Sequence, residues 1–168
     1  MNTTSLRLVL GAMSTLIAVP ALASEPPAVA YPEGYRAWTH VKSMVIEDGH
    51  PLAGAFGGIH HIYANQQALQ GYRNVAQGKG RFPDGAVIVF DLLEARRGGG
   101  AVEEGARKVV GVMVKDAAKY KTTGGWGFEG FKGDSKTERA VGKDAEVACF
   151  NCHAPQKAQD YTFSRYRP

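Results

Sequence analysis

Two apolar segments in the middle of the chain constrain the fold more than any other feature. Residues 86–94 (AVIVFDLLE) are apolar on both faces up to Phe90, and residues 107–115 form a second segment rich in valine. A strand that is apolar on both faces is expected at the centre of a sheet. Residues 96–105 are rich in glycine and charge, which predicts a turn or mobile loop between the two strands.

Shorter segments complete the predicted fold. Residues 59–63 (IHHIY) and 125–131 predict further strands, and residues 66–72 predict a short helix. Consecutive strands joined by short loops favour an antiparallel sheet. We therefore predict an α+β fold, in which helices flank a mainly antiparallel sheet, as a single domain over residues 24–168.

A helix is predicted before the first of these strands. The apolar residues there recur at helical spacing: Tyr35, Trp38, Val41, Met44 and Val45. This pattern predicts an amphipathic helix over 33–46, with its apolar stripe in the core.

The N-terminus predicts export. Arg7 precedes an apolar run over residues 8–19, which has the length of the hydrophobic region of a signal peptide. Pro20 ends the run, and residues 21–23 (ALA) have the small-x-small pattern of a cleavage site. The alternative, an uncleaved anchor, needs about 20 apolar residues. We expect residues 1–23 to be a signal peptide that is cleaved after Ala23, and a periplasmic mature chain.

The charge pattern gives little indication of a macromolecular partner. The formal net charge is +4, and the positive residues are scattered rather than gathered in a stripe. This argues against nucleic acid as a partner. A modest preference for an acidic redox partner protein stays open.

The two cysteines of the chain lie three residues apart, in Cys149-Phe150-Asn151-Cys152-His153. Two thiols at this spacing each add to one vinyl group of a single haem, and the adjoining histidine then reaches the iron. A dithiol redox pair would be expected within a βαβ pattern, which is not predicted here. A structural zinc site usually needs four ligands. The motif therefore predicts one covalent haem c, bonded to Cys149 and Cys152, with His153 as iron ligand.

The second axial position distinguishes an electron carrier from a ligand-binding protein. A carrier usually fills this position with Met or His, whereas an open position binds small ligands. The sequence offers these candidates: His40, His50, His60, His61, Met44 and Met113. His60 and His61 are neighbours on a predicted strand, so their side chains point to opposite faces.

Aromatic residues in and around the predicted strands favour an apolar haem pocket. They are Phe56, Phe82, Phe90, Trp126, Phe128 and Phe131. An ordinary core would explain any one of them. Because the polarity of the distal pocket decides what a haem iron does, the set as a whole is informative.

Six segments, in this order along the chain, resemble the cytochrome P460 family, which includes the cytochromes c′-β. They are residues 31–38 (YPEGYRAW), 82–90 (FPDGAVIVF), 114–116 (VKD), 124–128 (GGWGF), 149–153 (CFNCH) and 160–166 (DYTFSRY). The resemblance implies a largely antiparallel β-fold with flanking helices, a homodimer and a five-coordinate haem.

The family has two functional branches. The P460 enzymes carry a lysine cross-linked to the haem and oxidise hydroxylamine. The cytochromes c′-β lack the cross-link and bind nitric oxide and carbon monoxide in an apolar pocket lined by phenylalanine. Phe90 stands here at the position of the cross-linking lysine, and Gly111 lies nearest the position of a carboxylate that assists proton transfer in the enzymes. By the same resemblance, Phe56 corresponds to a second residue of the distal pocket.

Three functions remain in competition. The resemblance favours a cytochrome that binds nitric oxide or carbon monoxide at an open, apolar distal site. The alternatives are an oxidoreductase that acts on hydroxylamine, which would need a lysine cross-link, and an electron-transfer cytochrome, which would need a sixth ligand.

Overall fold

The computed structural model describes residue 1, residues 29–141 and residues 144–168. Apart from residue 1, the predicted signal peptide and its cleavage site lie outside the described residues. None of the helices in the described ranges is both long and apolar enough to span a membrane.

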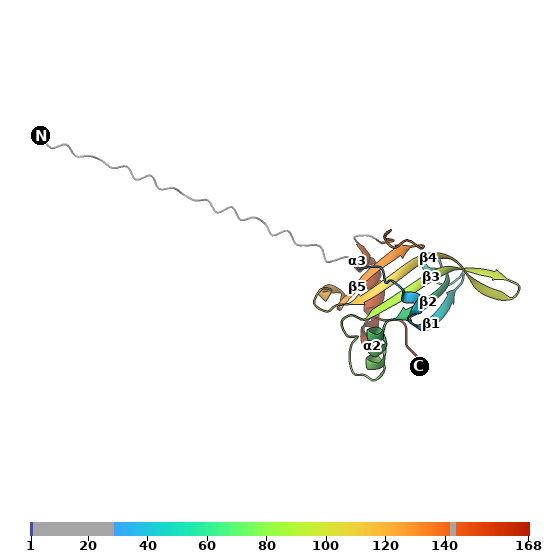
Figure 1. Cartoon of the computed structure of the whole chain (residues 1–168), viewed down its shortest axis with the longest axis horizontal. Coiled ribbons are helices and arrows are strands. Elements are labelled where there is room, and N and C mark those ends of the chain that lie inside the picture. The colour runs from blue at the N-terminus through green and yellow to red at the C-terminus, as the bar shows by residue number, and fades with distance from the viewer. Residues whose placement is uncertain (2–28, 142–143) are drawn as a thin grey trace.

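Five strands within the described residues form one antiparallel sheet, in which each strand pairs with its neighbours in the chain. They are β1 (Thr39–Ile46), β2 (Gly58–Ala64), β3 (Val87–Gly98), β4 (Ala101–Lys115) and β5 (Trp126–Lys132). The strand predicted to be central, β3, is the middle strand (Figure 1). The predicted α+β class is confirmed.

Short helices connect and flank these strands. They are η1 (Tyr35–Ala37), α1 (Ala53–Phe56), α2 (Gln66–Ala76), η2 (Lys121–Thr123), α3 (Ala145–His153) and η4 (Ala154–Gln159). The helix predicted over 66–72 is confirmed as α2. Asn65 caps it, because its Oδ1 atom accepts from the backbone N–H of Ala68 at 2.9 Å.

The helix predicted over 33–46 is wrong, because β1 occupies most of that range. The pairing of β1 with β2 shifts register between His40 and Lys42, which interrupts the strict alternation of side chains at Val41. Apolar residues three apart thereby come to resemble one face of a helix. The β-branched residues of β1 favour the strand.

The loop predicted over 96–105 is also wrong, except at its centre. β3 and β4 continue as a long hairpin whose register ends at the pair Gly98 and Ala101. Gly99 and Gly100 form the two-residue turn, with φ angles of 58° and 79°. Both positions need positive φ, which glycine adopts without strain.

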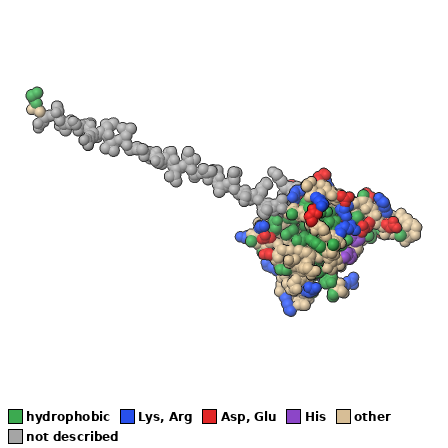
Figure 2. All heavy atoms as spheres, in the orientation of Figure 1, with side chains coloured by type: hydrophobic (Ala, Val, Ile, Leu, Met, Phe, Trp, Pro, Cys, Tyr) green, Lys and Arg blue, Asp and Glu red, His purple; other side chains and the backbone are tan. Residues whose placement is uncertain are grey.

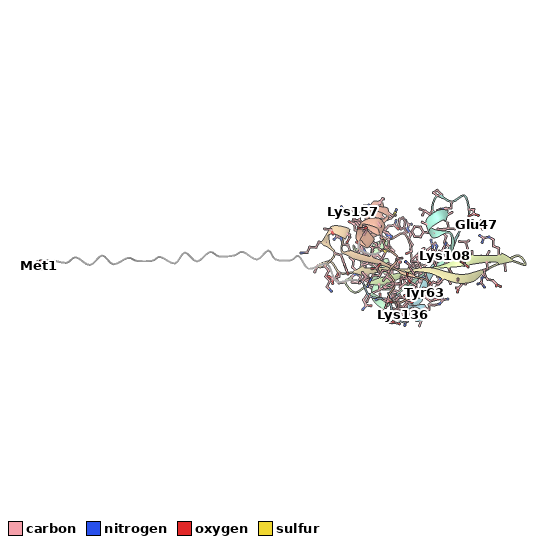
Figure 3. The ribbon with its side chains drawn as sticks, turned by 90° about the horizontal axis from the view of Figure 1, so that it is seen from above. Met1, Glu47, Tyr63, Lys108, Lys136 and Lys157 are labelled. Carbon is pink, nitrogen blue, oxygen red and sulfur yellow. The ribbon has the colours of Figure 1, made fainter. Side chains whose placement is uncertain are left out.

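The two faces of the sheet carry separate cores. We call the face covered by α2 and α3 the α3 face, and the opposite face the Tyr63 face. On the α3 face Ile62, Ile88 and Phe128 pack against helical residues that include Leu69 and Tyr72. On the Tyr63 face Val89, Val110 and Phe131 pack against the segment before β1. Figure 3 shows α3 and the segment near Glu47 on one side of the sheet, and Tyr63 and Lys136 on the other.

A buried carboxylate stabilises the Tyr63 face. Asp91 on β3 is fully buried, and its two oxygens accept from Arg36 at 2.9 Å and from Arg107 at 2.7 Å. These charge-assisted bonds compensate the cost of burying the carboxylate.

Figure 2 views the molecule in the orientation of Figure 1 and shows an apolar area bordered by charged side chains.

Candidate haem site

The Cys-x-x-Cys-His motif forms the C-terminal half of α3. Residues three and four apart lie on the same side of a helix, so Cys149 faces the same way as Cys152 and His153. Cys149 is half-buried and packs against the core of the α3 face, whereas Cys152 is exposed, and both thiols are free. The helix therefore presents both thiols and the imidazole together.

The state of Cys149 argues against a redox dithiol. Burial raises the pKa of its thiol, and the neighbouring charges of Glu129 and Cys152 act in the same direction. A nucleophilic cysteine of the thioredoxin kind needs a lowered pKa.

A hydrogen bond fixes which ring nitrogen of His153 carries the proton. Its Nδ1 atom lies 2.8 Å from the carbonyl oxygen of Tyr161. Because a carbonyl only accepts, Nδ1 carries the proton and the lone pair of Nε2 is left to bind a metal. The ring packs against Phe128 at 5.1 Å and against Phe163 at 4.9 Å. Burial lowers the pKa of His153, although the bond to Tyr161 acts in the opposite direction. The imidazole is thus neutral, as an iron ligand must be.

The second predicted part of the site lies on β3 and α1. Phe90 is half-buried on the α3 face, and its ring meets that of Phe56 edge-on at 5.7 Å. Phe56 is 38% exposed, which is high for a phenyl ring. The structure therefore brings together the two residues that the sequence suggested for a distal pocket.

β4, the strand between Phe90 and the strand that packs against His153, has a glycine at its centre. β4 separates β3 from β5, which carries Phe128. The residue of β4 opposite Phe90 is Gly111, and the residue of β5 opposite Gly111 is Gly130. A Cβ atom on Gly111 would lie 3.4 Å from the Phe90 side chain, so any larger group there would occupy the space beside the ring.

The candidates for a second axial ligand are divided between the two faces of the sheet. His60 and His61 point to opposite faces, as predicted: the His60 ring packs against Phe90 with 4.6 Å between ring centres, whereas His61 on the Tyr63 face hydrogen-bonds Ser43 at 2.6 Å and lies 2.8 Å from the Glu104 carboxylate. His40 bonds the same Ser43, and His50 accepts from the backbone of a turn. Met44 is 41% exposed on β1 and pairs with His60, so it lies on the α3 face, where Met113 packs in the core.

The contact of His60 with Phe90 was not predicted from the sequence. It is 5% exposed, and its Nδ1 atom has no hydrogen-bond partner among the described residues. Burial lowers the pKa of His60 to about 4, with smaller contributions from Lys42 and His61. His60 is therefore uncharged at neutral pH and places no positive charge beside Phe90.

Exposed apolar side chains flank the site on both sides. The segment around α1 exposes Leu52 and Phe56, and Phe163 is exposed beside the His153 ring. The α1 segment and α3 stand on the same side of the sheet (Figure 3). A large flat apolar group would cover these surfaces, and the thiols and the free Nε2 would anchor it. The residues present therefore fit a haem.

A comparison with protein families supports this description. The family model described as Cytochrome P460 matches residues 32–164, which include both phenylalanines and the whole motif of α3. A comparison with curated proteins found no match.

Proposed function

The chain belongs to the cytochrome P460 family, a family of haem proteins, and from this premise we propose that it is a mono-haem c-type cytochrome of the c′-β branch. Its ligands would be nitric oxide or carbon monoxide, bound in an apolar distal pocket. Cys149 and Cys152 would hold the haem through thioether bonds, and His153 would be its protein ligand through Nε2. The haem, when bound, supplies an iron with one axial position open to a small ligand.

The observation that carries the proposal is the pairing of Phe90 with Gly111 on the α3 face. A phenyl ring has no nucleophilic nitrogen with which to bond a haem carbon, and glycine has no carboxylate with which to move a proton. The two groups on which the hydroxylamine-oxidising branch depends are thus replaced by an apolar ring and an empty position.

Lys108 lies on β4 near Gly111, but it does not replace the cross-linking lysine of the P460 enzymes. Lys108 donates from Nζ to the carbonyl oxygen of Gly57 at 2.7 Å. This bond directs the ammonium group toward Gly57 and ties β4 to the residue that follows Phe56. Lys108 therefore supports the segment that carries Phe56. Oxidation of hydroxylamine, which would need a lysine cross-link, is thus the less supported function.

Phe90 and Phe56 would exclude water from the open side. Neither side chain donates a hydrogen bond, so a polar ligand that needs one is disfavoured, whereas nitric oxide and carbon monoxide depend on one much less. Neutral His60 packs against Phe90 without adding charge. The residues of this pocket thus select for small, weakly polar ligands.

Electron transfer is the alternative that a specific observation favours, because His60 is buried on the α3 face with an unpartnered Nδ1. We expect His60→Ala to leave the absorption spectrum of the reduced protein nearly unchanged, because in the proposed site His60 would not be a ligand of the iron. His61→Ala, on the opposite face, is the matched control. Conversion of a low-spin to a high-spin spectrum by His60→Ala alone would favour an electron carrier.

Export is the second part of the proposal. We expect the mature protein to begin at Ser24 and to reside in the periplasm, where covalent haem attachment takes place in Gram-negative cells. N-terminal sequencing of native protein tests this directly. A mature chain that begins at Met1 would refute cleavage. The homodimer implied by the family resemblance and a redox partner protein belong to the same proposal.

A further inference from the structure

A buried ion pair lies next to the residue that holds His153. Lys115 ends β4 and Asp160 follows η4, and their side chains are only 3% and 4% exposed. The Nζ atom of Lys115 donates to both oxygens of Asp160, at 3.0 and 2.9 Å. Asp160 directly precedes Tyr161, whose carbonyl oxygen accepts the proton of His153 Nδ1.

The backbone at this point adopts a conformation that its residues do not favour. Asp160 has φ 47° and Tyr161 has φ 66°, and they are the only non-glycine residues with positive φ in the described part of the chain. Two successive left-handed residues with side chains persist only where the surroundings hold them.

Three segments hold Asp160 in that conformation. Its carboxylate accepts from the backbone N–H of Phe82 at 2.8 Å in addition to Lys115. Its carbonyl oxygen accepts from Nε1 of Trp126 at 2.9 Å, and Trp126 begins β5. Contacts from the loop before β3, from β4 and from β5 thus fix Asp160, the residue before Tyr161.

Lys115 also fixes the loop that receives the Tyr161 ring. Its Nζ atom donates to the carbonyl oxygen of Gly124 at 2.9 Å. A Cβ atom on Gly124 would overlap the ring of Tyr161, so only glycine leaves room for it there. The ring then packs against Phe150, between the two cysteines, at 5.3 Å.

From these contacts we propose that the Lys115–Asp160 pair positions the axial histidine. The pair fixes the direction of the Tyr161 carbonyl, which accepts the hydrogen bond from Nδ1 of His153. The strength of that hydrogen bond would set how strongly Nε2 of His153 donates to iron. A hydrogen bond from the far nitrogen of a metal-bound imidazole raises the basicity of the ligand. The inference rests on the proposed ligation of haem by His153.

The test is the iron–histidine stretching frequency of the reduced protein, measured by resonance Raman spectroscopy together with the reduction potential. Asp160→Asn removes the charge that holds Lys115 and keeps the shape. We expect a lower stretching frequency and a higher reduction potential, because the hydrogen bond to Tyr161 weakens. A role in stability alone would change neither quantity in folded protein.

Asp91→Asn is the matched control, because Asp91 is also a buried carboxylate held by cations but lies on the Tyr63 face. It should destabilise the fold and leave both quantities unchanged. The double variant Lys115→Met/Asp160→Asn removes both charges, so we expect it to fold more readily than Asp160→Asn, which leaves the Lys115 charge buried without its partner. It should show the same shift as Asp160→Asn.

The outcomes are distinct. A shift in the Asp160 variants but not in Asp91→Asn supports the positioning role. Unchanged frequency and potential in both Asp160 variants, with a normal band in the unmodified protein, would overturn this inference and leave the proposed function intact. An unmodified protein without an iron–histidine band would overturn both.

Discussion

Replacing Cys149 and Cys152 together with alanine is expected to abolish covalent haem and to leave little folded protein. The two thiols on α3 are the only cysteines of the chain, so no other residue can form the thioether bonds. Mass spectrometry of denatured, unmodified protein should find haem still bonded to the peptide that contains both cysteines. The double variant should show none.

The expected loss of folded protein follows from the apolar surface at the site. Phe56 and Phe163 are 38% and 57% exposed without a covering group, and water contact with such surface is unfavourable. Asn151→Ala, an exposed change inside the same motif, is the control and should retain the haem. Free extraction of haem from the unmodified protein by acidified solvent would contradict covalent attachment.

Phe90→Ala is expected to speed the association of carbon monoxide and nitric oxide by at least about tenfold, which corresponds to roughly 1.4 kcal/mol of barrier. The half-buried ring lies on the α3 face beside Phe56 and opposite Gly111, so in the proposed pocket its removal would open a path to the iron. The measurement is flash photolysis or rapid mixing of the reduced protein, on a variant shown to be folded by circular dichroism.

Phe163→Ala is the matched control for this experiment. Phe163 contacts His153 rather than Phe90, so its loss should affect ligand association much less. Unchanged rates in folded Phe90→Ala would remove Phe90 from the distal pocket. A lysine–haem cross-link in the unmodified protein would instead place it with the hydroxylamine-oxidising branch.

The sheet was predictable from local pattern wherever burial and propensity agreed. β3 combines β-branched residues with apolar residues on both faces, and it proved to be the central strand. β1 was mistaken for a helix because the register shift near Val41 imitates helical spacing. The outer half of the hairpin was mistaken for a loop because Gly99 and Gly100 lie among charged residues, although only these two form the turn.

The candidate site divides in the same way. Its cysteines and His153 are contiguous in sequence, so the motif alone identified them. The residues that hold His153 were not identified, because the conformation of Asp160 and Tyr161 depends on contacts with Phe82, Lys115 and Trp126. A lysine in an apolar strand was a possible signal, but its partner lies 45 residues away. His60 was recognised as facing one side of the sheet, but not as a neighbour of Phe90.

The absorption spectrum of the purified, reduced protein, recorded before and after addition of nitric oxide, tests the central claim most directly. A covalent haem whose iron has His153 as its one protein ligand, beneath an apolar pocket, predicts broad high-spin bands that change when nitric oxide is added. Sharp six-coordinate bands that do not respond to nitric oxide, or absorption far to the red, would contradict it.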